Sequence, residues 1–256
     1  MVDEIDNNGH NKEKAFVYKA RDQIVEIYSS NLKCLAPEKY LDDSIIRFFV
    51  AYLLKDVLNP KTADRIHVFD NLFHSKIYEI FGPPNKADSS EAKRENKECR
   101  ERRIRLEEAE KLKKWKQLSK WFRGIDLFEK SYLIFPICQE EHWFSVIVCY
   151  PGEVADMDQI DLTMSPEPDV IDLTERTVKP VPGVLVLDSL GLSNYQTTRE
   201  IREFLDLEWR ARQTTIKSFS FHNLPQYHPR LPTQNNAYDC GPYTLAYLKE
   251  IGRAHV

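Results

Sequence analysis

Four side chains in the second half of the chain have the types and the order needed for nucleophilic attack on a carbonyl group. They are His142, Asp188, Gln234 and Cys240. A thiol at the start of a helix has a lowered pKa, because the helix dipole and free amide groups stabilise the thiolate. A nearby imidazole can take the thiol proton, and a carboxylate on its other nitrogen would fix the tautomer. The Gln234 amide and backbone N–H groups beside Cys240 would hold the resulting oxyanion.

Each of these residues is ordinary when it is considered alone. An isolated Cys before a Gly is usually a small buried residue. A His next to a Trp at a strand start is more often structural than catalytic, and an Asp that closes a strand is common turn chemistry. Their joint order and local contexts favour a thiol-dependent active site.

The hydrophobic pattern predicts the elements that must position these residues. Strands are expected over 132–137, 143–150 and 184–188, so that His142 lies at the start of one and Asp188 at the end of another. Helices are expected over 43–54, after the capping candidates Asp42 and Asp43, and over 198–212 and 241–251. Residues 216–221 alternate like an outer strand. Helices and strands without regular βαβ alternation predict the α+β class.

Composition excludes several classes of protein. The 256 residues include 36 Lys and Arg against 40 Asp and Glu, which excludes a general nucleic-acid binder acting through bulk positive charge. No apolar run is long enough to span a membrane, and the N-terminus lacks a signal-peptide pattern. The five cysteines are odd in number and form no CxxC pair, so neither a disulfide framework nor a zinc site is expected. We therefore expect a soluble protein of a reducing compartment, without metal or cofactor.

Charge is unevenly spread along the chain. Residues 86–123 contain 14 basic and 8 acidic side chains, whereas residues 152–176 contain 8 acidic and 1 basic. Because residues 91–117 lack Pro and Gly and alternate in sign, the first stretch predicts a long solvated helix. A solvated helical face explains it better than nucleic-acid binding or an import signal. The second stretch contains Pro166 and Pro168 and predicts a disordered loop between two strands.

Three motifs together resemble those of the SUMO-specific cysteine proteases, the Ulp/SENP family. His-Trp at 142–143 opens a strand, Leu-Asp-Ser-Leu at 187–190 closes the next, and Gln-Asn-Asn-Ala-Tyr-Asp-Cys-Gly at 234–241 enters a helix. Segments 40–49 and 120–128 are also similar to family segments, so the resemblance runs from about residue 31 to the end. It implies a papain-like fold with a central mixed sheet and flanking helices. The insertions at about 83–118 and 151–182 are most similar to those of the branch that trims poly-SUMO chains.

The resemblance also implies a role for each site residue. Cys240 would be the nucleophile, His142 the general base and then acid, Asp188 the orienting carboxylate, and Gln234 the oxyanion donor. Four further residues would contact the substrate: Trp143, Tyr40, Asp43 and Gly241. Among them, the Trp would cover a narrow channel that admits only a Gly-Gly tail.

The implied organisation is an N-terminal extension over 1–30 and a single catalytic domain over 31–256. The chain ends 16 residues after Cys240, where the family continues with further helices, so we expect a truncated domain. The expected partners of this monomer are SUMO and SUMO-conjugated proteins, and its expected location is the nucleus, with the cytoplasm as the alternative. Two alternatives remain at this stage: a protease of the same fold that acts on NEDD8, and a truncated, inactive protein that only binds SUMO.

The acidic stretch contains a candidate SUMO-interacting motif, formed by Val170, Ile171, Asp172 and Leu173. Such a segment adds a strand to an exposed sheet edge of SUMO, with its apolar side chains in a groove and its acidic flank against basic residues. The related segment 159–163 lacks one β-branched residue and is the poorer candidate.

Overall fold

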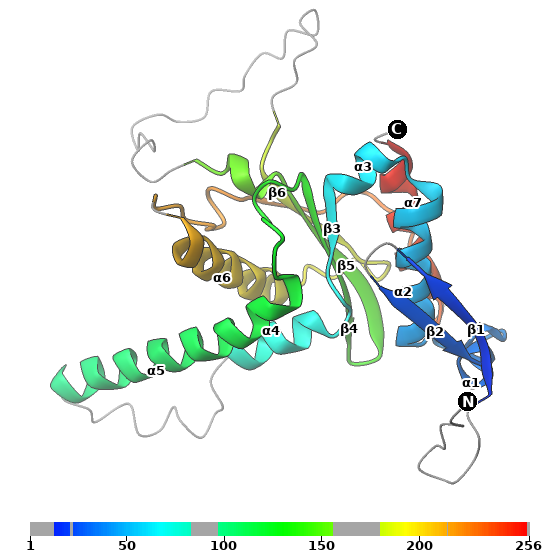
Figure 1. Ribbon diagram of the computed structural model, residues 1–256, viewed down its shortest axis with the longest axis horizontal. Coiled ribbons are helices and arrows are strands. Elements are labelled where there is room, and N and C mark those ends of the chain that lie inside the picture. The colour runs from blue at the N-terminus through cyan, green and yellow to red at the C-terminus, as the bar shows by residue number, and fades with distance from the viewer. Residues whose placement is uncertain (1–12, 21–22, 83–96, 156–179, 214, 255–256) are drawn as a thin grey trace, which may run out of the picture.

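A five-stranded mixed sheet lies at the centre of the computed structural model, which describes residues 13–20, 23–82, 97–155, 180–213 and 215–254 (Figure 1). Its strand order is β3-β4-β5-β6-β7. The strands are β3 (Ile66–Val68), β4 (Tyr132–Gln139), β5 (His142–Cys149), β6 (Gly183–Leu187) and β7 (Gln226–Tyr227). The two outer pairs are parallel and the inner pairs are antiparallel. The mixed sheet predicted from the sequence is therefore present.

Helices cover both faces of this sheet (Figure 1). Helices α4 (Phe73–Phe81) and α6 (Tyr195–Arg212) lie on one face, and α2 (Asp43–Tyr52) and α7 (Cys240–Ala254) lie on the other. Successive residues of β4 enter different cores: Leu133 packs with α4 and α6, whereas Ile134 packs with α2 and α7. Burial on both faces explains why the central strands are continuously apolar instead of alternating.

The N-terminal part contributes to the core beneath α2. Strands β1 (Lys14–Lys19) and β2 (Ile24–Tyr28) form an antiparallel hairpin, followed by α1 (Ser29–Leu32) and the 3₁₀ turn η1 (Lys33–Leu35). Val25 and Ile27 are buried in the same cluster as Trp143 and Cys240. Residues within the predicted extension 1–30 thus support the face of the sheet on which the candidate nucleophile lies.

Polar caps set the start of the helices on this side. The Asp42 side chain accepts a 3.0 Å hydrogen bond from the Ile45 N–H, as the sequence predicted for the start of α2. The α-helical part ends at Tyr52, two residues before the predicted end at residue 54, and continues as the π-helix η2 (Leu53–Val57). Helix α3 (Pro60–Asp64) follows, with the Asn59 side chain as its cap.

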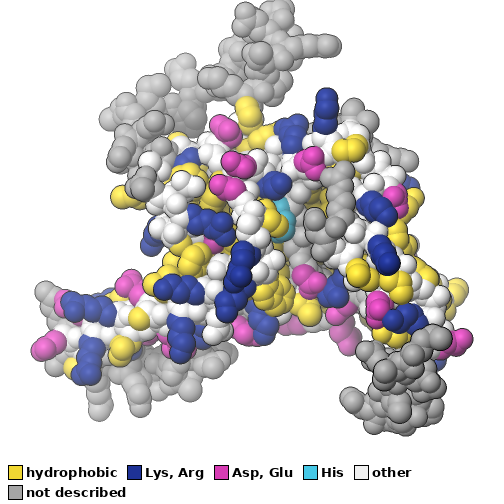
Figure 2. Space-filling model, viewed as in Figure 1, with side chains coloured by type: hydrophobic (Ala, Val, Ile, Leu, Met, Phe, Trp, Pro, Cys, Tyr) yellow, Lys and Arg dark blue, Asp and Glu magenta, His cyan; other side chains and the backbone are white. Residues whose placement is uncertain are grey.

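A long charged helix, α5 (Lys97–Leu118), projects from the body as predicted and ends in the 3₁₀ turn η4 (Ser119–Phe122). Figure 2 shows Lys and Arg side chains along this arm. Only its base is buried: the Trp115 Nε1–H donates a 3.0 Å hydrogen bond to Oε2 of the buried Glu208 in α6. Within the described residues, no helix combines the length and the apolar character needed to cross a bilayer.

Two sequence predictions differ from the structure. The outer strand predicted over 216–221 is wrong, because the Phe219 N–H bonds to the Asp206 side chain and not to a neighbouring strand. Residues 151–155, which were assigned to the acidic insertion, include the 3₁₀ turn η5 (Pro151–Glu153) and the buried Val154. Both motif candidates, at 170–173 and 159–163, lie outside the described residues, as does the start of the charged insertion.

Candidate active site

The sheet brings His142 and Asp188 together at one end. Strands β5 and β6 are neighbours, and His142 is the first residue of β5 whereas Asp188 directly follows β6. The distance between His142 Nε2 and Asp188 Oδ1 is 2.9 Å. Helix α7 begins with Cys240, which is fully buried; its Sγ lies 4.0 Å from the Glu141 carbonyl, one residue before His142, and its pKa responds to the His142 imidazole. The three residues that the sequence singled out therefore meet in one place, in the order Asp, His and Cys.

The Asp188 carboxylate is held by three donors. Oδ1 accepts hydrogen bonds from His142 and from the Leu190 N–H at 2.7 Å, and Oδ2 accepts one from Asn194 Nδ2 at 2.7 Å. Burial alone would raise the pKa of this carboxyl, but the three hydrogen bonds outweigh it and lower the pKa below its ordinary value. Asp188 is thus a fixed anion that orients the imidazole and stabilises its charged form.

The charges of the His and the Cys are coupled. Hydrogen bonds to Asp188 and to Cys240 raise the pKa of His142 to about 9, against the effect of burial. Burial would raise the pKa of the Cys240 thiol, but hydrogen bonds from His142 and from the backbone N–H groups of Trp143 and Gly241 lower it. Because Nε2 of the imidazole is bonded to Asp188, Nδ1 remains for the thiol. Such a pair can exist as a thiolate beside an imidazolium, which is the reactive form of a cysteine nucleophile.

Gln234 is buried close to this pair, and its amide is oriented by a neighbour of Asp188. The Ser189 hydroxyl donates to Gln234 Oε1 at 2.5 Å, and the Gln234 backbone N–H donates to the Ser189 carbonyl at 3.1 Å. The Gln234 Nε2 donates to the Asn236 carbonyl at 2.7 Å. Since an amide nitrogen carries two hydrogens, one remains available to an oxyanion.

The predicted substrate-contact residues lie around a close approach between Leu41, just before α2, and the start of α7. A Cβ added to Gly241 would lie 2.9 Å from the Leu41 Cβ, so only glycine fits at this position. The Trp143 Nε1–H donates a 3.0 Å hydrogen bond to the Leu41 carbonyl, and its side chain is only 2% exposed. Tyr40, one residue earlier, is 44% exposed, and Asp43 is exposed at the start of α2. Trp143 and Gly241 are thus packed against Leu41, whereas Tyr40 and Asp43 are exposed at the surface.

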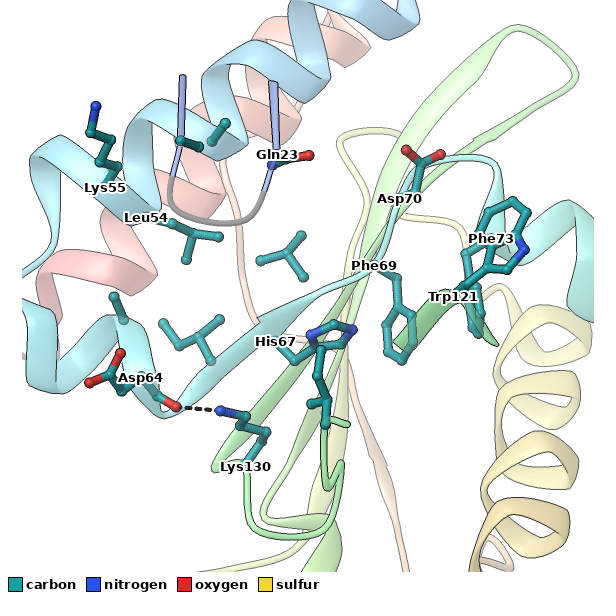
Figure 3. Close-up of a pocket in the computed structure, with 16 residues that line it drawn as sticks. Gln23, Leu54, Lys55, Asp64, His67, Phe69, Asp70, Phe73, Trp121 and Lys130 are labelled. Carbon is teal, nitrogen blue, oxygen red and sulfur yellow. Dashed lines mark hydrogen bonds between the residues drawn. The ribbon is translucent and has the colours of Figure 1, made fainter. Parts of the chain in front are cut away.

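A separate hollow of about 400 Å³ lies along β3 (Figure 3). His67 and Lys130 line it together with the aromatic side chains of Phe69 and Trp121, and none of the three clustered residues does. Burial and the charge of Lys130 lower the pKa of His67 to about 4. Among the described residues, no group of three or more His, Cys, Asp or Glu side chains could hold a metal ion.

Sequence reasoning did not single out Ser189 and Asn194, which hold the side chains of Gln234 and Asp188. Asn194 has the left-handed backbone angles φ 49° and ψ 35° and precedes α6, but its side chain donates to Asp188 and makes no cap bond. The available signals were the polar residue next to Asp188 and an Asn shortly before a predicted helix. Neither signal specifies which distant side chain is held.

Comparison with known proteins identifies the family. Residues 39–255 match the model of the Ulp1 protease family, C-terminal catalytic domain. The chain belongs to this family. The resemblance inferred from the sequence motifs is therefore confirmed, and so is the assignment of the chain to a family of cysteine proteases.

Relatives and solved structures agree with this membership. The chain is 27% identical to sentrin-specific protease 7 of Rattus norvegicus over 261 residues, which cover 88% of this chain and 23% of the relative. It is 28% identical to probable ubiquitin-like-specific protease 2B of Arabidopsis thaliana over 228 residues, 88% of this chain and 21% of the relative. The chain spans about a quarter of the length of these curated relatives.

Two solved structures share the Ulp1-family fold. A de-sumoylating protease superposes with a TM-score of 0.60 at 20% identity, covering 93% of this chain and 72% of that chain. The Ulp1 protease domain in complex with Smt3, the yeast orthologue of SUMO, gives a TM-score of 0.51 at 18% identity, covering 93% and 77%. The predicted α+β fold of this protease family is thus confirmed.

Proposed function

We propose that this chain is a thiol isopeptidase that cleaves after the C-terminal Gly-Gly of SUMO and so releases SUMO from conjugated proteins. The observation that carries the proposal is the His142–Asp188 hydrogen bond of 2.9 Å, with the buried Cys240 thiol at the start of α7 lying 4.0 Å from the Glu141 carbonyl, next to that imidazole. Membership of the Ulp1 family and the names of its relatives support SUMO as the substrate.

The proposed reaction follows from these positions. The Cys240 thiolate attacks the carbonyl carbon of the terminal Gly, and the oxyanion accepts hydrogen bonds from Gln234 and from backbone N–H groups. His142 then donates its Nδ1 proton to the leaving amine, and a thioester remains on the enzyme. A water molecule, deprotonated by the same imidazole, hydrolyses the thioester and regenerates the thiol. Asp188 holds the imidazole in one orientation throughout.

The proposed specificity for Gly-Gly rests on the space beside the nucleophile. Trp143 is buried against Leu41, and Gly241 approaches Leu41 so closely that a methyl group would clash. A substrate backbone that reaches Cys240 alongside this packed contact has little room for side chains, so that two glycines are selected by exclusion of larger residues. Tyr40 and Asp43 would contact the rest of the substrate at the surface.

The finer proposal is that the chain trims poly-SUMO. Its support is the resemblance of the two insertions to those of the chain-trimming branch, together with the candidate motif at 170–173, which remains a prediction from the sequence. Replacing Val170, Ile171 and Leu173 with Ala should then weaken the cleavage of SUMO chains and spare that of a single SUMO with a small leaving group.

A SUMO probe with a C-terminal vinyl sulfone tests the main proposal. The probe should form a covalent adduct that peptide mapping places on Cys240 and not on Cys34, Cys99, Cys138 or Cys149. Cys240→Ser should remove the adduct and lower turnover on the order of 10⁶-fold, whereas Cys138→Ser serves as the matched control. Labelling of another cysteine, or faster labelling by an otherwise identical NEDD8 probe, would refute the proposal.

A further inference from the structure

The loop between β6 and α6 has two chemically different sides. Asp188, Ser189 and Asn194 point inward and hold the site. Leu192 and Tyr195, by contrast, are 51% and 55% exposed. Both line a hollow of about 180 Å³ whose wall includes Asp188 itself. An exposed apolar surface is therefore continuous with the carboxylate of the site.

Further side chains extend this surface. The Tyr195 ring lies 5.9 Å from the His228 ring and 6.1 Å from the Phe221 ring, between centroids, and both neighbours are exposed. Leu190 is 49% exposed and lies beside Asp188, to which its N–H donates. We define the loop surface by these residues: Leu190, Leu192, Tyr195, Phe221 and His228. Large apolar side chains that are exposed together, and not scattered singly, are typical of an interaction surface.

Hydrogen bonds between the loop and the segment at β7 hold the loop surface in place. The Gln226 Nε2 donates to the Ser193 carbonyl at 2.7 Å and is 3.0 Å from His228 Nε2. The Thr198 hydroxyl donates to Gln226 Oε1 at 2.5 Å. A surface that is ordered before binding loses little conformational entropy when a partner docks.

The direction of proton transfer shows which part of a substrate meets the loop surface. The proton on His142 Nδ1 must pass to the leaving nitrogen, which therefore lies within hydrogen-bond reach of the imidazole. The acyl carbon is the atom that the Cys240 sulfur attacks, so it lies on the Nδ1 side of the imidazole. The loop that begins at Asp188 is bonded to the other nitrogen of the same ring, so the hollow that Asp188 lines adjoins the place where the leaving nitrogen meets His142.

We propose that the loop surface binds the polypeptide on the amine side of the scissile isopeptide bond, through apolar side chains in the segment that flanks the modified lysine. This inference rests on the proposed function and deepens it. Conjugates whose modified lysine is flanked by apolar residues are then cleaved faster than other conjugates. The rate of cleavage of substrates with a small leaving group does not depend on the loop surface.

Two substrates with the same acyl side separate this role from the chemistry itself. One is SUMO with a C-terminal aminomethylcoumarin, and the other is SUMO linked by an isopeptide bond to a lysine flanked by apolar residues. The double variant Leu192→Ser/Tyr195→Ser should lower kcat/KM for the isopeptide substrate about tenfold and change that for the coumarin substrate less than twofold. The matched control is Leu106→Ser/Tyr78→Ser, which removes exposed side chains of the same types from α5 and α4 and should leave both substrates unaffected.

Binding to the inactive Cys240→Ser background provides a second measurement. The isopeptide substrate should bind about tenfold more tightly than free SUMO, and the double variant should abolish the difference. Equal losses on both substrates, or no loss on the isopeptide substrate, would overturn the loop-surface proposal while leaving the proposed function intact. If the unmodified chain cleaved neither substrate, the proposed function would fail and this inference with it.

Discussion

His142 and His67 are two partly buried histidines in different regions of the molecule, and their pKa values move in opposite directions. Hydrogen bonds to Asp188 and Cys240 raise the pKa of His142 to about 9. Burial and the nearby Lys130 lower the pKa of His67 to about 4 in the hollow along β3. Burial disfavours the imidazolium in both regions. The neighbouring groups therefore make the two pKa values differ: Asp188 and Cys240 favour the charged form of His142, whereas Lys130 disfavours that of His67. At neutral pH only the first histidine is a proton donor.

The two shifts have opposite consequences for stability. The raised pKa of His142 contributes stability that is fully present below the ordinary histidine pKa near 6.5 and is lost as the pH rises through about 9. The lowered pKa of His67 contributes stability that is present above 6.5 and is lost as the pH falls towards 4. The two contributions together favour the folded state most strongly at pH values around 6.5.

The largest expected effect comes from removal of the Asp188 carboxylate, whose hydrogen bond to His142 raises the pKa of that histidine. Asp188→Asn should lower kcat/KM for SUMO-aminomethylcoumarin roughly 10³- to 10⁴-fold, because the imidazole loses both its orientation and the anion that stabilises its charge. An NMR titration should show the pKa of His142 falling towards that of His67. The control is Asp126→Asn, a partly buried carboxylate outside the site that accepts a 2.9 Å hydrogen bond from the Phe128 N–H. Near-normal activity in Asp188→Asn would mean that the His142–Asp188 contact is structural.

The pH dependence of turnover should reflect the same charges. The lowered pKa of Cys240 predicts that thiolate forms, and activity appears, below the ordinary cysteine value near 8.5. Loss of the imidazolium should reduce kcat/KM about tenfold for each pH unit above about 9. Because the two groups titrate as a pair, the limits of a kcat/KM profile belong to the pair. A profile that rises steadily beyond pH 10 would contradict the ion-pair mechanism.

A smaller effect is expected at the other histidine. His67→Phe retains the aromatic packing against Phe69, whose ring lies 4.5 Å away between centroids, and removes the titration. Urea unfolding should show that the unmodified chain loses about 1 to 2 kcal/mol more stability between pH 7 and pH 5 than the variant does. Turnover per folded molecule should be equal in the two proteins. The same loss in both would show that His67 is not desolvated.

The smallest effect concerns the turn that leads into His142. Glu140 and Glu141 join β4 to β5 with φ angles of 51° and 62°, a left-handed conformation that Asn-Gly adopts with less strain. Replacing the pair with Asn-Gly should raise the free energy of unfolding by about 1 kcal/mol. If the register of the sheet alone positions His142, kcat/KM should change less than threefold. A large loss of activity would show that the strained turn aligns the imidazole.

Much of the site could be predicted because its residues lie at the ends of strongly patterned elements. The apolar runs of β4, β5 and β6 gave clear strands, and these strands bring His142 next to Asp188. The position of Cys240 at the first residue of α7 was also predictable, since Gly241 and Pro242 are compatible with the start of a helix. In each case the decisive information is local in the sequence.

Contacts between distant polar side chains could not be predicted in this way. The buried His74–Glu200 pair, 3.1 Å apart between α4 and α6, joins residues whose sequence surroundings are those of ordinary surface helices. The failure of the strand predicted over 216–221 has the same origin, because the bond from Phe219 to Asp206 replaces the pairing that the local pattern suggests. The burial of Val25 and Ile27 likewise depends on docking against α2, which no pattern within the hairpin reveals.

The contact between Leu41 and Gly241 has a mechanical consequence. The Leu41 carbonyl accepts the Trp143 indole N–H, and its side chain abuts the residue next to Cys240. The segment before α2, strand β5 and helix α7 therefore meet at one residue, Leu41. Because Leu41 lies two residues before α2, a tilt of that helix against the sheet would act first on Gly241, the neighbour of the nucleophile. The surface on which a substrate would press is thus joined to Cys240 through one packed residue.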